Sequence, residues 1–232
     1  MPRKKIVFVI VEGPSDSDAL ELLLSKIFYD DNVFVHITYG DITTHKDTTH
    51  VNILSKIGNL INSYIKSNHF NKTLFREIIH ILDTDGAYIP DSSVVFEPSA
   101  KHIQYTMTEI ITNKKDAITL RNKKKSQCLD KISSVKSIGG IPYHAFYMSC
   151  NLDHVLYDLM NPTDEEKEIN SIAFARKYEH DIDGFIQYIS ASAFSVQGDY
   201  IHTWKYIKEE LHSLERHTNL GLCFNSSQYD NI

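Results

Sequence analysis

Several features that would assign a protein class at once are missing from this sequence. Its 232 residues include only three cysteines, Cys128, Cys150 and Cys223, which are far apart and odd in number. This spacing fits neither a disulfide framework nor a CxxC metal site, and it favours a reducing compartment. The formal net charge is −6. The molecule as a whole is therefore no basic nucleic-acid binder, and any contact with a polyanion depends on a local patch.

Membrane-spanning stretches and several catalytic motifs are also missing. No apolar run approaches the roughly 20 residues that cross a bilayer. The N-terminal MPRKK leads into a short apolar run that ends at Glu12, unlike a signal peptide. We therefore expect a cytoplasmic protein without a membrane partner. No GxxxxGK[ST] motif indicates an ATPase, and no HExxH or GxSxG motif supports a zinc site or acyl transfer.

The first part of the chain alternates between strand-like and helix-like segments. The apolar, β-branched run IVFVIV is typical of a central parallel strand covered on both faces. The helix after it has Ser15 and Asp18 in the spacing of a capping box. The predicted strands cover residues 6–11, 32–39 and 78–82, and the predicted helices cover residues 15–28 and 51–67. This alternation predicts a doubly wound α/β sheet flanked by helices.

Beyond residue 87 the pattern is weaker. We expect a short helix near 99–112, a basic insertion at about 113–136, a fourth strand over 141–148, and a helix from about Leu152. The tail predicts helices over 165–189, interrupted near Asp183 and Gly184, and over 200–214. No repeat or linker marks a boundary. We therefore expect a catalytic domain over residues 1–160, with a helical C-terminal extension over residues 161–232 packed on it.

Acidic residues follow two of the predicted strands. Glu12 ends the first strand, and Asp83 and Asp85 end the third. Ligands of open parallel sheets bind outside the carboxyl ends of the strands. Three carboxylates at close quarters require a cation or strongly raised pKa values. Gly13 and Gly86 each follow an acid and allow the backbone to approach a ligand closely. The pattern predicts a Mg²⁺ or Mn²⁺ site suited to phosphodiester chemistry.

These motifs resemble the Toprim domain. The resemblance covers about residues 5–90: VEGPSD at the first strand end, Gly40 at the second, and DTDG at the third. Toprim domains occur in topoisomerases, DnaG-type primases and nucleases of the overcoming-lysogenisation-defect (OLD) group. Because no ATPase motif is present, the chain is most similar to small OLD-like and RloB-like phage-defence proteins. The resemblance implies a Toprim-like, Rossmann-like fold.

The same resemblance implies roles for individual residues. Glu12 would act as general acid or base or as a metal ligand, and Asp83 and Asp85 would be catalytic Mg²⁺ ligands. Asp16 and Asp153 would be further metal ligands. The glycines at the strand ends would let a phosphate approach the backbone: Gly13, Gly40 and Gly86. A simpler interpretation also stands, in which Glu12 and Asp16 only stabilise the start of the following helix.

The basic segment after residue 120 has two interpretations. Arg121, Lys123, Lys124 and Lys125 form a nucleic-acid-binding patch if they steer a phosphate backbone towards the acids. The alternative is a solvated loop with no binding role.

Three functions follow from this sequence. The first is a divalent-metal-dependent nuclease that acts on DNA or RNA in defence against phages or plasmids. The second is a non-catalytic binding or regulatory subunit of a defence complex. The third is a phosphatase or nucleotide hydrolase with a small substrate. The expected partners are nucleic acid and a separate ATPase or sensor protein, and association into homo-oligomers is left open.

Overall fold

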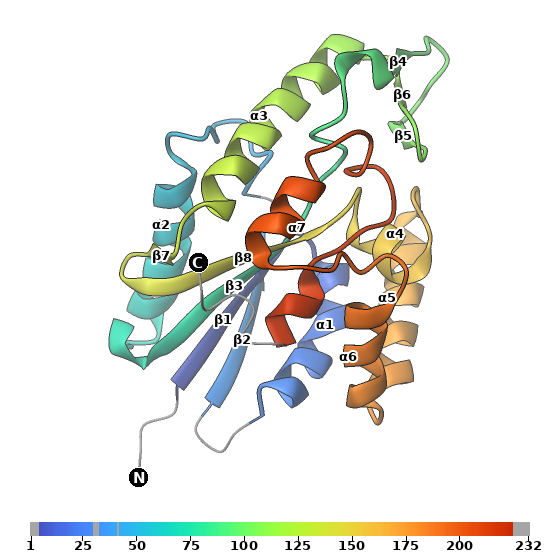
Figure 1. The fold of residues 1–232 in the computed structure, drawn as a ribbon. Coiled ribbons are helices and arrows are strands. Elements are labelled where there is room, and N and C mark those ends of the chain that lie inside the picture. The colour runs from blue at the N-terminus through green and yellow to red at the C-terminus, as the bar shows by residue number, and fades with distance from the viewer. Residues whose placement is uncertain (1–4, 30–32, 41, 225–232) are drawn as a thin grey trace.

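The protein has an α/β architecture in which one mostly parallel sheet lies between helices (Figure 1). This computed structural model describes residues 5–29, 33–40 and 42–224. The sheet has the strand order β2-β1-β3-β8-β7, and only β7 runs antiparallel to its neighbour. Its strands are β1 (Lys5–Val11), β2 (Val33–Tyr39), β3 (Phe75–Asp83), β7 (Ser137–Ile138) and β8 (Ile141–Met148). The four parallel strands confirm the sequence prediction, although Asn32 of the predicted second strand lies outside the described residues.

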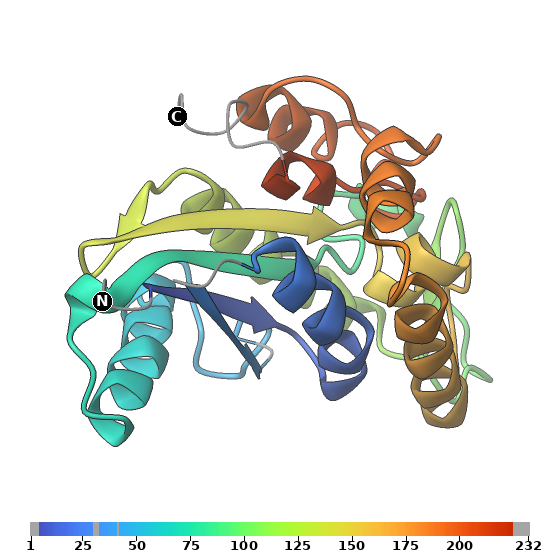
Figure 2. The same cartoon turned by 90° about the horizontal axis from the view of Figure 1, so that it is seen from below.

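Helices cover both faces of the sheet. The chain passes from β1 to its neighbour β2 through α1, and then back across β1 to β3 through α2. Right-handed crossovers in opposite directions place α1 on one face and α2 with α3 on the other (Figures 1 and 2). These helices are α1 (Pro14–Ile27), α2 (Ile53–Ser67) and α3 (Lys115–Ser133). The result is a buried central strand: Val7 to Val11 have almost no exposed surface.

The start of α1 differs from the prediction. Its N-cap is Gly13, and the side chain of Asp16 accepts a hydrogen bond from the Gly13 N–H at 2.8 Å. The predicted capping box of Ser15 and Asp18 is therefore wrong by two residues. Pro14 explains the shift, because proline lacks an N–H and fits the first position of a helix.

The segment 113–136 is no insertion. Most of it forms α3, the helix that connects β3 to β8 on one face of the sheet. Ile118, Cys128, Leu129 and Ile132 are buried on its inner side. The many lysines of α3 hid this apolar stripe, so the expectation of a basic insertion is corrected here.

An arm, defined as residues 94–112, stands beyond the sheet (Figure 1). It consists of three short strands in the order β4-β6-β5: β4 (Val94–Phe96), β5 (Gln104–Tyr105) and β6 (Ile110–Thr112). The helix predicted near 99–112 is therefore wrong. Val94 and Ile110 are buried in a small cluster with Leu214, and a contact so distant in sequence overrides local helical spacing.

The C-terminal part contributes four helices that differ in length from those predicted: α4 (Leu152–Tyr157), α5 (Asp164–Tyr178), α6 (Ile182–Ala191) and α7 (Tyr200–Tyr206). The interruption of the long predicted helix lies at residues 179–181. Asp181 caps α6 by accepting from the Gly184 N–H at 3.0 Å, so Asp183 and Gly184 lie inside its first turn. No helix in the described ranges is long and apolar enough to cross a membrane.

Residues 200–219 complete one edge of the sheet. The short β7 pairs only with the first residues of β8. Further along β8, the Tyr147 N–H donates to Asn219 Oδ1 at 2.8 Å, and Thr218 Oγ1 donates to the Tyr147 carbonyl at 2.7 Å. An unpaired strand edge is open to pairing with other chains. Residues 200–219 therefore form hydrogen bonds with backbone groups of β8 in addition to covering its side chains.

Candidate functional site

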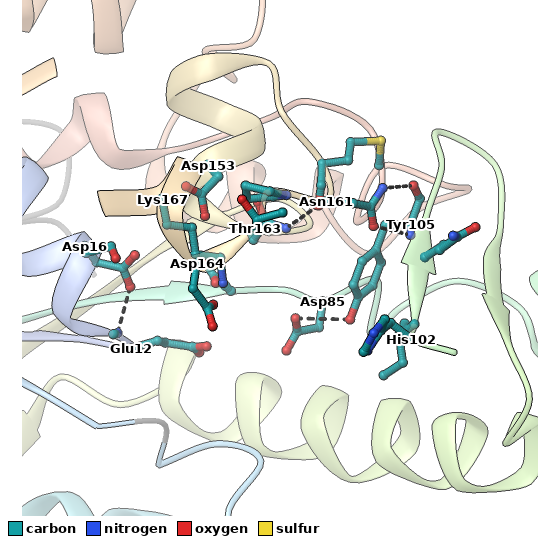
Figure 3. Close-up of a pocket in the computed structure, with 18 of the residues that line it drawn as sticks. Glu12, Asp16, Asp85, His102, Tyr105, Asp153, Asn161, Thr163, Asp164 and Lys167 are labelled. Atoms are coloured by element: carbon teal, nitrogen blue, oxygen red, sulfur yellow. Dashed lines mark hydrogen bonds between the residues drawn. The ribbon is translucent and has the colours of Figure 1, made fainter. Parts of the chain in front are cut away.

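A cavity of about 870 Å³ lies at the carboxyl edge of β1 and β3 (Figure 3). It is lined by residues from four parts of the chain: Glu12, Gly13 and Asp16; Asp83 and Asp85; His102, Ile103, Gln104 and Tyr105; and Asn151, Asp153, Asn161, Thr163, Asp164 and Lys167. All five predicted metal-ligand residues therefore face one cavity. Strand order explains this, since β1 and β3 are hydrogen-bonded neighbours and their ends meet.

A buried lysine joins two of the acids. Lys125 Nζ lies 3.3 Å from Glu12 Oε1 and 2.5 Å from Asp85 Oδ2. The Lys125 side chain has no exposed surface. Thr43 Oγ1 also donates to Glu12 Oε1 at 3.4 Å. The ammonium group therefore offsets negative charge at the ends of both strands.

Asp83 lies close to three other acids of the cavity. Burial raises the pKa of its carboxyl well above the usual range, and the charges of Glu12, Asp16 and Asp85 raise it further. Lys125 lowers it, but does not reverse the shift. The surroundings of Asp83 therefore favour the protonated form of its carboxyl.

Asp85 is fixed by backbone contacts. Its φ angle is +51°, in the left-handed region, and its N–H donates to the Cys150 carbonyl at 2.8 Å. The neighbouring Thr84 is buried and donates to the Ser213 carbonyl at 2.8 Å. Arg121 Nη2 donates to the Asp85 carbonyl at 2.8 Å. The turn after β3 is therefore held by Cys150, which follows β8, by Ser213, and by Arg121 of α3.

The side chain of Asp85 is stabilised in its charged form. Burial alone would raise the pKa of its carboxyl, but Lys125 and then Arg121 outweigh burial and lower the pKa. Tyr105 takes part as well, because its hydroxyl accepts from Arg121 Nη1 at 2.7 Å and lies 3.5 Å from Asp85 Oδ1. The surroundings of Asp85 therefore favour its carboxylate form.

The other end of the cavity is built from α1, α4 and α5. Burial, and then the charge of Asp153, raise the pKa of Asp16 to about 6, against the Gly13 N–H bond and Lys167, which lower it. Burial also raises the pKa of Asp153, and Lys167 lowers it. Both acids line the cavity, and Asp16 at the same time accepts the Gly13 N–H of the helix start. The capping role and a ligand role are therefore compatible for Asp16.

The three predicted glycines have different surroundings. Gly13 lines the cavity, whereas Gly40 and Gly86 are absent from its lining. At Gly86 the φ angle is +66°, and a Cβ atom would lie 2.7 Å from Leu214 Cδ2. The close approach at Gly86 is therefore to the protein core, which corrects the expected role in phosphate approach. Gly40 donates its N–H to the Val11 carbonyl at 3.0 Å.

The basic segment is divided between two sides of α3. Lys123 and Lys124 are exposed, while Lys125 is buried against the acids and Arg121 is half-buried against Asp85 and Tyr105. A solvated loop is excluded, because these residues lie within a helix. The expectation that Lys125 binds nucleic acid from the surface is corrected, because its ammonium group points into the protein.

Several residues of the cavity wall were not predicted from the sequence, among them Tyr105, Asn161 and Lys167. Tyr105 lies in the arm, which the sequence pattern assigned to a helix. Asn161 and Lys167 lie at the turn into α5 and in its first part. The segment NPT at 161–163 does carry a signal, since Thr163 is a typical N-cap and its hydroxyl accepts from the Glu166 N–H at 3.2 Å. A helix N-terminus alone does not indicate a cavity wall.

The residues fit a hard divalent cation by donor chemistry. Glu12, Asp83 and Asp85 present oxygen ligands of the kind that Mg²⁺ and Mn²⁺ prefer. The raised pKa of Asp83 also indicates that this group of acids lacks enough positive charge. In the part of the chain that the structure describes, no three His, Cys, Asp or Glu side chains are already arranged as a metal site. Lys125 holds Glu12 and Asp85 in the present arrangement.

Comparison of this chain with protein-family models, with curated proteins and with solved structures finds no match.

Proposed function

We propose that the protein is a divalent-metal-dependent phosphodiesterase of the Toprim type, a nuclease that hydrolyses DNA or RNA. One observation supports this most: acids from two neighbouring strand ends, Glu12, Asp83 and Asp85, face one cavity. Burial, and then the charges of the neighbouring acids, raise the pKa of Asp83. Clusters of this kind, with strongly shifted pKa values, are frequent at catalytic sites.

The residues divide the chemistry among them. Asp83 and Asp85 would hold Mg²⁺ or Mn²⁺, with Asp16 and Asp153 as further ligands. The bound ion would stabilise the negative charge that develops on the phosphate. Glu12 would orient the attacking water and accept its proton. Lys125, a buried positive charge beside Glu12 and Asp85, would add to the field on the phosphate.

The biological setting belongs to the same proposal. All three cysteines are buried, which is consistent with a reducing cytoplasm. We place the protein in defence against phages or plasmids, beside a separate ATPase or sensor protein. This step rests on the resemblance to small OLD-like and RloB-like proteins.

A second candidate has an observation of its own. The ammonium group of Lys125 already pairs with Glu12 and Asp85. A non-catalytic subunit that had kept the fold would be stable with this internal pairing and would need no metal. Metal binding separates the two candidates, because only the enzyme requires it.

The test is a cleavage assay with a paired variant. Purified protein is incubated with supercoiled plasmid and with single-stranded RNA in Mg²⁺, in Mn²⁺ and in EDTA, beside Asp83→Asn. Asp83→Asn keeps the size of the side chain and removes its charge. We expect metal-dependent cleavage that falls about 10³-fold or more in Asp83→Asn, since a bound metal contributes several kcal/mol to such reactions.

Asp18→Asn is the matched control. Asp18 is an exposed acid on α1, outside the cavity lining, and its variant should cleave like the wild type. If neither polymer is cleaved and calorimetry detects no Mn²⁺ binding, the non-catalytic candidate replaces the enzyme. Cleavage that persists in Asp83→Asn would show that the acids were assigned wrongly.

A further inference from the structure

The acids of the cavity are recessed. The side chains of Glu12 and Asp85 are only 12% and 22% exposed. A phosphate must enter the cavity to reach them. The walls of the cavity therefore decide which substrates can reach Glu12 and Asp85. The contacts that hold these walls together are especially important.

Two of these walls are joined by a pair of hydrogen bonds between Tyr105 and Asn161, which we call the clip. The arm contributes Tyr105, and the turn between α4 and α5 contributes Asn161; both line the cavity. The Tyr105 N–H donates to Asn161 Oδ1 at 2.8 Å, and Asn161 Nδ2 donates to the Tyr105 carbonyl at 2.8 Å. One asparagine side chain thus satisfies both backbone groups of one residue. Figure 3 shows this pair beside Asp85.

The clip is anchored at the acids. The Tyr105 hydroxyl accepts from Arg121 Nη1 at 2.7 Å, and the Arg121 guanidinium lies 5.8 Å from the centre of the Tyr105 ring. Arg121 itself bonds the backbone of Asp85. The arm is therefore fixed next to Asp85 by Arg121. Its hydrogen bonds to Asn161 join it to the α4–α5 turn, so that the two segments form one wall of the cavity.

The enclosed space has the size of a ligand pocket. Its volume of about 870 Å³ falls within the range of about 300–1,000 Å³ that is usual for small-molecule sites. A flexible strand can place one phosphate and its neighbouring base in such a space. A duplex is a stiff rod with a persistence length of about 150 base pairs. It cannot bend sharply enough to bring a single phosphodiester past the joined walls to the recessed acids.

We propose that the substrate is single-stranded nucleic acid, and that the Tyr105–Asn161 clip excludes duplexes from the acids. This inference rests on the proposed nuclease function and narrows it. It follows from the recessed acids, from the joined walls and from the size of the cavity.

The lining also suits a single strand. Ile103 is 38% exposed and lies beside Tyr105 in the wall, so an unstacked base meets an apolar and aromatic surface. On another wall Lys167 offers a cation for a neighbouring phosphate. Neither contact requires a paired base.

The experiment compares three substrates. The wild type and Asn161→Ala are given a labelled single strand, the duplex of the same sequence, and bis(4-nitrophenyl) phosphate, in Mn²⁺. We expect the wild type to cleave the single strand at least tenfold faster than the duplex. In Asn161→Ala this ratio should fall at least threefold, while hydrolysis of the small diester stays unchanged. Fluorescence anisotropy in EDTA should give the same order of affinities without turnover.

Asn113→Ala is the control for the clip, because Asn113 is exposed at the end of the arm and does not line the cavity. Equal cleavage of single strand and duplex by the wild type would overturn the substrate inference and leave the nuclease standing. A ratio that stays the same in Asn161→Ala would overturn the role of the clip. If none of the three substrates is hydrolysed, the proposed function itself fails, and the substrate inference fails with it.

Discussion

Asp85 and Asp16, at the two ends of the cavity, have pKa values shifted in opposite directions. At the β3 end, Lys125 and Arg121 lower the pKa of Asp85. At the α1 end, burial raises the pKa of Asp16 to about 6, and Lys167 lowers it only in part. Asp83 lies between them, and its pKa is raised by burial and by acids from both sides.

The difference shows what a buried cation achieves. Lys125 is fully buried, so its attraction to Glu12 and Asp85 is screened little by water. Lys167 is partly exposed in the cavity wall and acts through solvent. The pKa of Asp85 is therefore lowered, whereas the pKa of Asp16 stays raised, and a divalent ion bound to Asp16 would favour its ionised form.

The largest effect on this contrast is expected from Lys125→Met. Methionine keeps much of the apolar stem and removes the ammonium group that lies between Glu12 and Asp85. Breaking a buried pair in this way costs about 3–5 kcal/mol. We expect that loss in the free energy of unfolding, measured by urea denaturation in EDTA. Added Mn²⁺ should restore more stability to the variant than to the wild type, because the freed acids bind the ion.

Lys124→Met controls for the change of residue type. Lys124 precedes Lys125 on α3 and is exposed, so its loss should change stability by less than about 0.5 kcal/mol. Equal stability of the two variants would mean that the Lys125 pairs contribute nothing and that the two ends of the cavity are alike.

The charged groups of the two ends were not equally visible in the sequence. Glu12 and Asp83 were predictable because each follows an apolar strand, and neighbouring strand ends meet at one edge. Lys125 was assigned to the surface because it lies in a run of lysines. A helical spacing does connect it to the buried stripe, since Ile118, Asn122, Lys125, Leu129 and Ile132 are three or four residues apart. Only this helical spacing would have predicted from the sequence that the Lys125 side chain is buried.

The arm and its clip were beyond the sequence for a different reason. β5 has only two residues, and β4 and β6 have three each, so no periodicity develops. The Tyr105–Asn161 contact joins residues 56 positions apart through an asparagine, a residue type that is common in ordinary turns. Such non-local polar contacts depend on how the complete chain packs. The local patterns that predict individual strands and helices do not predict them.

A smaller effect is expected from Asp16→Asn. The pKa of Asp16 in the folded protein, about 6, lies above the ordinary value of 3.8 for an aspartate. Its contribution to stability is therefore fully present below about pH 4 and is lost as the pH rises through about 6. Asparagine still accepts the Gly13 N–H but does not ionise. In EDTA, the stability of Asp16→Asn relative to the wild type should rise by about 2 kcal/mol between about pH 4 and about pH 7.

Asp18→Asn, which removes an exposed carboxyl from the same helix, serves again as the control. If the two variants show the same pH profile relative to the wild type, Asp16 makes no pH-dependent contribution of its own. The contrast between the two ends of the cavity would then be lost.

The smallest effect concerns the outer side of α3, opposite the buried Lys125. Lys123 and Lys124 are exposed and, if they contact phosphates, each contributes about 0.7 to the salt slope of single-strand binding. The double variant Lys123→Gln, Lys124→Gln should therefore lower that slope by about 1.4 and weaken binding roughly tenfold at low salt. The control pair Lys66→Gln, Lys72→Gln removes the same charge beside the start of β3, at the edge of the sheet away from the acids. If both pairs change the slope equally, the exposed lysines of α3 have no specific role in steering nucleic acid.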